Sequence, residues 1–155
     1  MRHFELSTDI AAPAERVWEA LVTLPDWPRW NRLVPQGDGV VAVGEQLSFR
    51  IRVSPRDVVP PSFRPHRPTV LVVDRRATLV LEASFGARWM VHMVHSFFVE
   101  PTPEGCRLRQ TWETSGVLVP LLWPRLLAAQ QGFSEFGEDL GRYVREAQGP
   151  GINTT

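Results

Sequence analysis

The chain has 155 residues, 43% of them hydrophobic, and its 17 basic and 17 acidic side chains give a formal net charge of zero. A chain of this length buries about 70% of the surface that its unfolded form exposes, so we expect one globular domain with a hydrophobic core. Because the basic residues do not gather into a stripe, nucleic acid is not expected as a partner.

Targeting signals and disulfides are not indicated either. The N-terminus has no apolar segment of signal-peptide length, and no stretch approaches the roughly 20 apolar residues of a membrane span. We therefore predict a cytoplasmic protein without a membrane span. Cys106 is the only cysteine, so no disulfide can form within the chain, and burial as a small apolar residue is the simplest expectation.

The first third of the chain predicts a strand followed by two short helices. Apolar side chains alternate from Phe4 to Ile10, which is typical of a strand. Pro13 suits the first position of a helix, because its missing N–H would be unpaired there in any case. The inner stripe of that helix is formed by Val17, Trp18, Leu21 and Leu24. Pro25 then ends it, and Trp27, Trp30 and Leu33 predict a second short helix or turn.

The middle of the chain has the period of antiparallel strands. Residues 47–53 place Leu47, Phe49, Ile51 and Val53 on one face, with Ser48, Arg50 and Arg52 on the other. Residues 54–69 contain five prolines, so we predict a long surface loop or lid there. Further strands are predicted at 70–73, 78–85, 88–99 and 106–114, with a hairpin turn at 101–105.

The last third predicts one long helix from Pro120, about 25 residues and roughly 38 Å long. Its inner stripe consists of Leu126, Phe133, Phe136, Leu140 and Val144, and its outer face of Arg125, Glu135, Glu138, Asp139, Arg142 and Arg145. Gly132, Gly137 and Gly141 each cost up to about 1 kcal/mol in a helix. They indicate either room beside a cavity, or close contact with the sheet and bending of the helix. Residues 1–147 are the predicted domain, and 148–155 a flexible tail.

This order of elements resembles the START-like superfamily, also called SRPBCC, or the polyketide cyclase/dehydrase and lipid-transport group. The resemblance runs from about Phe4 to Ala147 and depends on Ile10-Ala11-Ala12-Pro13, Val17-Trp18, Leu21, Trp27, Trp30-Asn31, Gly44, Phe63-Arg64-Pro65, Val70-Leu71, His95, Phe97, Gly105 and Gly116-Val117-Leu118-Val119-Pro120. It implies an α+β helix-grip fold, with a curved antiparallel sheet of about seven strands around the C-terminal helix and an apolar cavity between them.

Two polar residues are predicted to project into this interior. Alternation along 88–99 places His95 on the same inward face as Trp89, Met93 and Phe97, and on the last strand it turns Gln110 and Trp112 inward. A buried imidazole must hydrogen-bond a neighbour, a water or a ligand. His95 would orient or protonate a carbonyl-bearing ligand with Gln110 as a second donor, or would simply bond Gln110 or a backbone carbonyl.

Other chemistries have little support in the sequence. His92 and His95 point to opposite faces of a strand, His92 is expected to be exposed, and no metal site or cofactor is predicted. Glu82 and Glu113 could pair as acid and base only if both faced inward, and alternation places Glu113 outside. No phosphate-binding loop, dinucleotide fingerprint or nucleophile elbow is present.

The tryptophans could line a pocket for a flat molecule or simply fill the core. The predicted ligand-binding residues are Trp30, Asn31, Phe49, Ile51, Trp89, Met93, His95, Phe97, Gln110, Trp112, Phe133 and Phe136. Trp123 could guard a portal together with the proline-rich loop.

The main functional hypothesis is the binding of a hydrophobic small molecule such as a polyketide, a lipid or an aromatic metabolite. One alternative is a cofactor-independent cyclase or dehydratase that uses His95 as general acid or base. Another is a ligand-gated protein-interaction module with residues 54–69 as its lid. The sequence leaves open the ligand, its transformation and the oligomeric state, including a homodimer.

Overall fold

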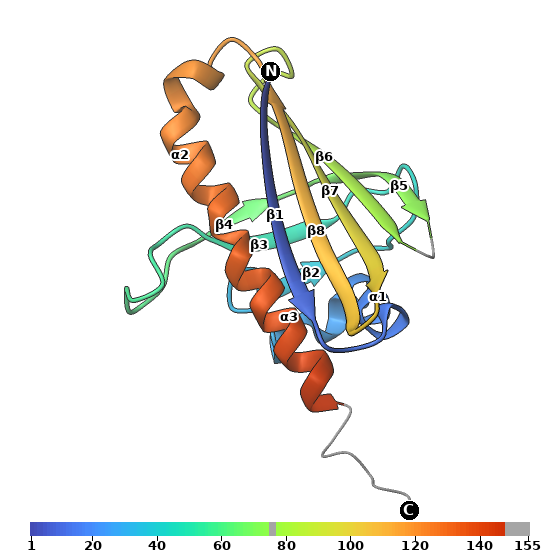
Figure 1. The fold of residues 1–155 in the computed structure, drawn as a ribbon. Helices are drawn as coiled ribbons and strands as arrows, with labels where there is room; N and C mark the ends of the chain where they lie inside the picture. The colour runs from blue at the N-terminus through green and yellow to red at the C-terminus, as the bar shows by residue number, and fades with distance from the viewer. Residues whose placement is uncertain (75–76, 148–155) are drawn as a thin grey trace, which may run out of the picture.

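The chain forms two antiparallel sheets and a C-terminal pair of helices (Figure 1). The computed structural model describes residues 1–74 and 77–147, so the tail predicted at 148–155 lies outside the described residues. The elements are β1 (Arg2–Ile10), α1 (Ala14–Val22), the 3-10 helix η1 (Leu24–Arg29), β2 (Gln36–Asp38), β3 (Ser48–Arg52), β4 (Phe63–His66), β5 (Thr69–Asp74), β6 (Thr78–Phe85), β7 (Val91–Thr102), β8 (Gly105–Ser115), α2 (Val119–Gln131) and α3 (Phe133–Ala147).

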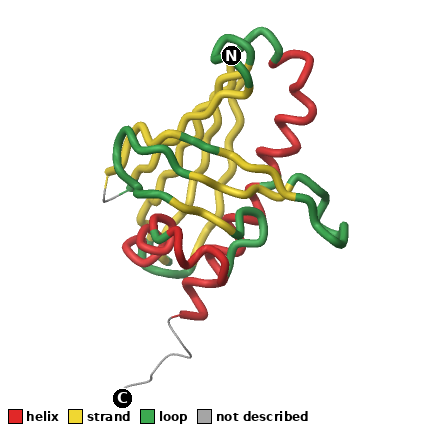
Figure 2. The backbone as a smooth tube through the Cα atoms, turned by 180° about the vertical axis from the view of Figure 1, so that it is seen from behind, coloured by secondary structure: helices red, strands yellow, loops and turns green. Residues whose placement is uncertain are grey.

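The two sheets form one curved wall. The larger has the strand order β1-β8-β7-β6-β5 and the smaller the order β2-β3-β4. They meet where Gln46 bridges Thr69 and where the Val70 N–H donates to the Glu45 carbonyl at 2.9 Å. In the view from behind, the strands pass in front of the C-terminal helical segment, α2–α3 (Figure 2). The predicted α+β helix-grip fold is therefore confirmed.

The first helices follow the predicted pattern. Pro13 precedes α1, and the buried face of α1 is formed by Ala14, Val17, Trp18 and Leu21. Leu24 and Trp27 are buried in η1, whose first turn contains Pro25. Trp27 packs against Phe49 and Phe136, with ring centroids 5.1 and 5.4 Å apart, so η1 joins β3 to α3 in one core.

The single closing helix of the prediction is divided at Gly132. The Gly132 N–H donates to the Ala128 carbonyl at 3.1 Å. Figure 1 shows the change of direction between α2 and α3. A Cβ atom on Gly137 would lie 2.5 Å from Thr8 Oγ1, and one on Gly141 would lie 3.2 Å from Ile10 Cγ1. These two glycines thus serve close contact between α3 and β1, the second of the alternatives drawn from the sequence.

Two strand predictions were wrong. Residues 63–66 lie in the predicted loop but form β4, which tolerates Pro65 because it is an edge strand and an edge needs fewer donors. The loop is confined to residues 53–62. The three-residue β2 adds an eighth strand, too short to show alternation in the sequence.

In the described residues, no helix has the length and apolar character needed to cross a bilayer.

Candidate functional site

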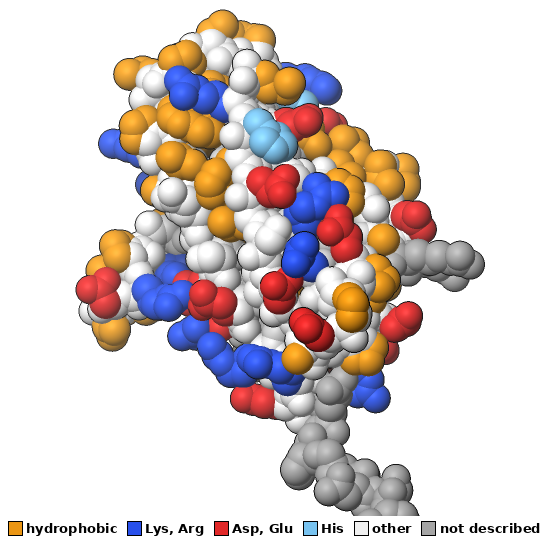
Figure 3. Space-filling model, viewed as in Figure 1, with side chains coloured by type: hydrophobic (Ala, Val, Ile, Leu, Met, Phe, Trp, Pro, Cys, Tyr) orange, Lys and Arg blue, Asp and Glu red, His pale blue; other side chains and the backbone are white. Residues whose placement is uncertain are grey.

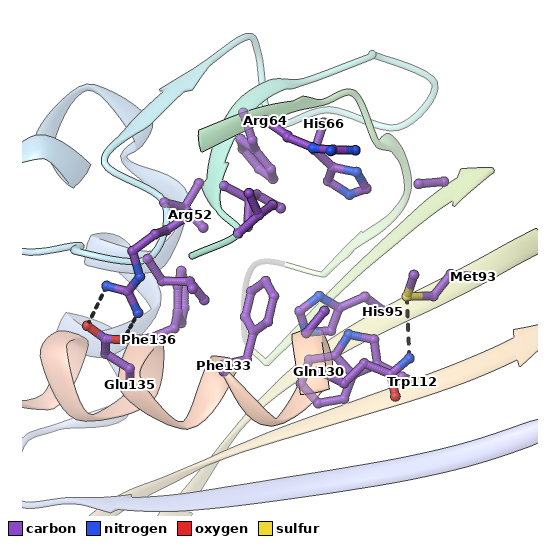
Figure 4. Close-up of a pocket in the computed structure, with 18 of the residues that line it drawn as sticks. Arg52, Arg64, His66, Met93, His95, Trp112, Gln130, Phe133, Glu135 and Phe136 are labelled. Carbon is purple, nitrogen blue, oxygen red and sulfur yellow. Dashed lines mark hydrogen bonds and ion pairs between the residues drawn. The ribbon is translucent and has the colours of Figure 1, made fainter. Parts of the chain in front are cut away.

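A cavity of about 820 Å³ lies between the sheet wall and the α2–α3 segment. Figure 4 shows Arg64 and His66 on one side of it, and Phe133 and Phe136 of α3 on the other. Its aromatic lining is formed by Trp27, Phe49, Phe85, Phe97, Trp112, Phe133 and Phe136. The side chains of the described residues leave this volume unfilled.

His95 lies on the cavity wall among aromatic rings. Its imidazole stacks on Trp112 with centroids 4.2 Å apart, lies 4.1 Å from the Phe97 ring and meets the edge of Phe133 at 4.8 Å. Part of the ring remains accessible from the cavity, so the residue is only half-buried although apolar groups separate it from bulk water.

The hydrogen bonds of His95 define which ring nitrogen carries the proton. Gln110 Nε2 donates to the Phe133 carbonyl at 3.3 Å, which turns the amide oxygen of Gln110 toward His95 Nε2 at 3.1 Å. An amide oxygen only accepts, so Nε2 of His95 is the protonated nitrogen. His95 Nδ1 has no hydrogen-bond partner among the described residues and retains an acceptor lone pair.

Burial lowers the pKa of His95 to about 3, and the Gln110 hydrogen bond only partly opposes this effect. The imidazole is therefore neutral over the physiological range. Its Nδ1 can accept a hydrogen bond from a ligand hydroxyl or N–H, but the ring is a weak base, and near pH 7 it carries only the Nε2 proton that it donates to Gln110.

A second polar group at the cavity edge is ionic. Both Arg52 terminal nitrogens donate to Glu135, Nη1 to Oε1 at 3.1 Å and Nη2 to Oε2 (Figure 4). Arg56 Nε lies 3.4 Å from Oε2, and Arg32 Nε lies 3.5 Å from Oε1. Burial raises the pKa of Glu135, but the Arg52 hydrogen bonds and the three guanidinium charges outweigh it, so the net pKa lies below the ordinary value.

The ionic cluster extends along α3. Arg32 donates to Asp139 from Nη2 at 2.7 Å, and this hydrogen bond raises the pKa of Arg32. Arg56 Nη2 lies 3.7 Å from Glu138 Oε2, which attaches the 53–62 loop to α3. Acidic and basic side chains accordingly lie side by side where this loop meets the helix (Figure 3).

These contacts correct the prediction for two acidic residues. Glu135 and Asp139 were expected on the outer face of the helix, yet their residues are only 2% and 1% exposed. Arg52 was expected on the outward face of β3 and instead borders the cavity. The available signal was the spacing of Glu135 and Asp139, which flank the core positions Phe136 and Leu140 on neighbouring turns.

Eight of the twelve predicted ligand-binding residues line the cavity: Phe49, Ile51, Met93, His95, Phe97, Trp112, Phe133 and Phe136. The other four do not. Trp30 is core, stacked on Tyr143, and Asn31 accepts the Val34 N–H at 2.7 Å. Gln110 lies behind His95, fully buried. Trp89 precedes β7 and is 67% exposed, because the regular strand begins only at Val91.

Two further expectations need correction. His92 is not simply exposed, because its Nε2 lies 3.0 Å from Glu82 Oε2 and only 15% of its side chain is accessible. Trp123 is not part of the cavity wall, and the Arg2 guanidinium lies 5.0 Å above its ring.

Sequence reasoning missed several polar residues of the cavity. His66 lines it from β4 and stacks on Phe85, and burial lowers the pKa of His66 to about 4. Gln130 lines it from the end of α2 and donates to Thr114 Oγ1 at 3.0 Å. His66 was missed because residues 54–69 were predicted to be a loop. Gln130 was missed because the partly polar end of α2 has no periodic pattern in the sequence.

Solved structures of similar fold come from proteins of several kinds. Protein MLL2253 from Mesorhizobium loti has 22% identity and a TM-score of 0.69, covering 96% of this chain and 100% of that one. Norcoclaurine synthase from Thalictrum flavum, in complex with dopamine and hydroxybenzaldehyde, has 16% identity and a TM-score of 0.66, covering 96% and 88%. The di-domain ARO/CYC BexL from the BE-7585A biosynthetic pathway has 18% identity and a TM-score of 0.72, covering 97% and 48%.

These likenesses show the shared fold. No curated protein sequence matches the chain. The family model described as polyketide cyclase / dehydrase and lipid transport matches residues 1–147. That span includes every strand and helix described above, and it confirms the resemblance drawn from the sequence. The chain therefore belongs to the polyketide cyclase / dehydrase and lipid transport family.

Proposed function

We propose that this protein binds a hydrophobic small molecule in the cavity between the sheet wall and α2–α3. The observation that carries the proposal is a volume of about 820 Å³ with a largely apolar lining that includes seven Phe and Trp side chains. Such a volume falls within the range of small-molecule sites, which are mainly apolar with a few placed polar groups. Burial of ligand surface at about 25 cal/mol per Å² supplies the affinity.

His95 is the polar group that orients the ligand. Its protonated Nε2 is occupied by Gln110, so the cavity-accessible Nδ1 accepts a hydrogen bond from a ligand hydroxyl or N–H. A ligand with an aromatic ring and a hydroxyl group would satisfy both this acceptor and the surrounding rings of Trp112 and Phe133.

The enzymatic alternative has less support from this geometry. A general acid must be protonated at the working pH, and the pKa of His95 is about 3. As a general base, His95 would have little driving force to accept a proton. We therefore place binding ahead of a cyclase or dehydratase reaction that depends on His95.

A neutral fluorescent probe tests the binding proposal. N-phenyl-1-naphthylamine should bind saturably, and Ala83→Phe, which adds a ring at the cavity wall, should weaken its binding about tenfold. The matched control is Ala87→Phe, at an exposed position outside the cavity, which should leave the affinity unchanged. Absence of saturable binding, or equal affinities for wild type and Ala83→Phe, would contradict the proposal.

A further inference from the structure

The charges around the cavity are unequal. Among the described residues, its lining includes four arginines, Arg52, Arg56, Arg64 and Arg125, but only two acidic residues, Glu82 and Glu135. Both carboxylates are already paired. Glu135 binds Arg52 through both oxygens, with Arg56 beside it, and Glu82 lies 3.0 Å from His92 and 3.8 Å from Arg88.

Two of the four arginines have no acidic partner in the described part of the chain: Arg64 and Arg125. Arg64 lies in the edge strand β4, opposite Ile51, and Arg125 lies in α2, one turn before Ala128 and Ala129 of the cavity wall. Both are exposed to solvent and both line the cavity, so they stand at its mouth, where the apolar lining meets water.

In the part of the chain that the structure describes, the inner part of the cavity offers no comparable charge. His95 is neutral near pH 7, since burial lowers its pKa to about 3, and burial likewise lowers the pKa of His66 to about 4. Arg52 is fully engaged by Glu135. An anion on the ligand would thus find unpaired cations only at the mouth, and its apolar part would occupy the aromatic interior.

From this arrangement we propose that the ligand is an amphiphile whose carboxylate or phosphate group binds Arg64 and Arg125 while its apolar part fills the cavity. The inference rests on the proposed binding function and adds the chemical class of the ligand. Guanidinium groups suit the role because they are weakly hydrated and can bind either oxyanion through two parallel hydrogen bonds. The two arginines are specificity-determining residues in this scheme.

The test compares cis-parinaric acid with its methyl ester, which has the same chain but an uncharged head group. Wild type should bind the acid about tenfold more tightly than the ester at low salt, and the preference should shrink as salt screens the mouth. The double variant R64Q/R125Q should lose most of this preference and keep its affinity for the ester. The matched control is R16Q/R50Q, which removes two exposed arginines outside the cavity and should behave as wild type.

The outcomes separate the two proposals. Equal binding of acid and ester by wild type, or an unchanged preference in R64Q/R125Q, overturns the anionic class while the binding function stands. Failure of the ester and of N-phenyl-1-naphthylamine to bind overturns the binding function itself. Competition of dodecanoate and dodecyl phosphate against the bound acid then identifies the head group, since the better competitor carries the preferred oxyanion.

Discussion

Two of the polar pairs that border the cavity differ in charge. His95 and Gln110 form a neutral hydrogen bond among three aromatic rings, whereas Arg52 and Glu135 form an ion pair with two more guanidinium groups nearby. Burial disfavours charge in both places. The number of opposite charges within reach decides the result, because three arginines outweigh the desolvation of Glu135 and no carboxylate compensates that of His95.

This contrast gives the cavity two different borders. In the proposed binding mode, the neutral border would contribute one hydrogen-bond acceptor and aromatic surface to the ligand. The ionic border holds the 53–62 loop against α3 through Arg56, and residues 54–56 of that loop line the cavity. The proposed lid role of the loop stays a prediction.

Removal of one ionic partner should have the largest effect. We expect Arg52→Met to lower the free energy of unfolding by about 3 kcal/mol or more, because it leaves Glu135 buried with its main partner missing. Urea denaturation measures the loss. The double variant R52M/E135L should lose less than the sum of the single changes, since it leaves no unpaired charge.

The matched control is Arg107→Gln, which removes an exposed ion pair with Asp9. Its unfolding midpoint should equal that of wild type. Similar midpoints for R52M and R107Q would mean that the buried pair contributes no more than a surface pair.

As the pH falls, the free energy of unfolding should decrease first through the buried histidines and only later through Glu135. His66 and His95 have folded pKa values of about 4 and 3, below the ordinary value of 6.5, so the unfolded chain binds more protons once the pH falls below 6.5. Each histidine should reduce the free energy of unfolding by about 2 kcal/mol or less between pH 7 and pH 5. Folding also lowers the pKa of Glu135, so its contribution has the same sign, but it is lost only as the pH falls below the ordinary pKa of 4.5.

Urea titrations at several pH values from 7 to 5 check this dependence. His95→Gln and His66→Gln should each flatten the slope of stability against pH, whatever their effect on stability at pH 7. His3→Gln, at an exposed position, should leave the slope unaltered. A wild-type slope that survives both substitutions would assign the proton uptake to other groups.

The smallest of these effects concerns the neutral hydrogen bond itself. His95→Phe keeps an aromatic ring beside Trp112 but leaves the Gln110 amide oxygen without its donor, at a cost of about 1 kcal/mol. Gln110→Leu removes the donor to Phe133 as well. In a double-mutant cycle, H95F/Q110L should cost less than the two single changes together, and strict additivity would show that the pair is not coupled.

Much of the fold could be predicted because its signals are local. Alternation along β7 and β8 placed His95 and Trp112 on the inner face, and the apolar stripe of α3 placed Phe133 and Phe136 there. Such periodicities are properties of neighbouring residues and survive without knowledge of partners. The prediction that Trp89 faces inward was wrong because alternation cannot reveal where a regular strand begins.

The sequence by itself determined the order of the long strands and of the helical segments, the faces of those strands and the apolar stripe of α3. Only the tertiary structure decided which charged residues turn inward. Arg52 and Glu135 are 83 positions apart, and Arg32 and Asp139 are 107 apart. A carboxylate is stable inside a protein only when a cation meets it, and contacts over such separations arise from the packing of sheet against helix, not from any local pattern.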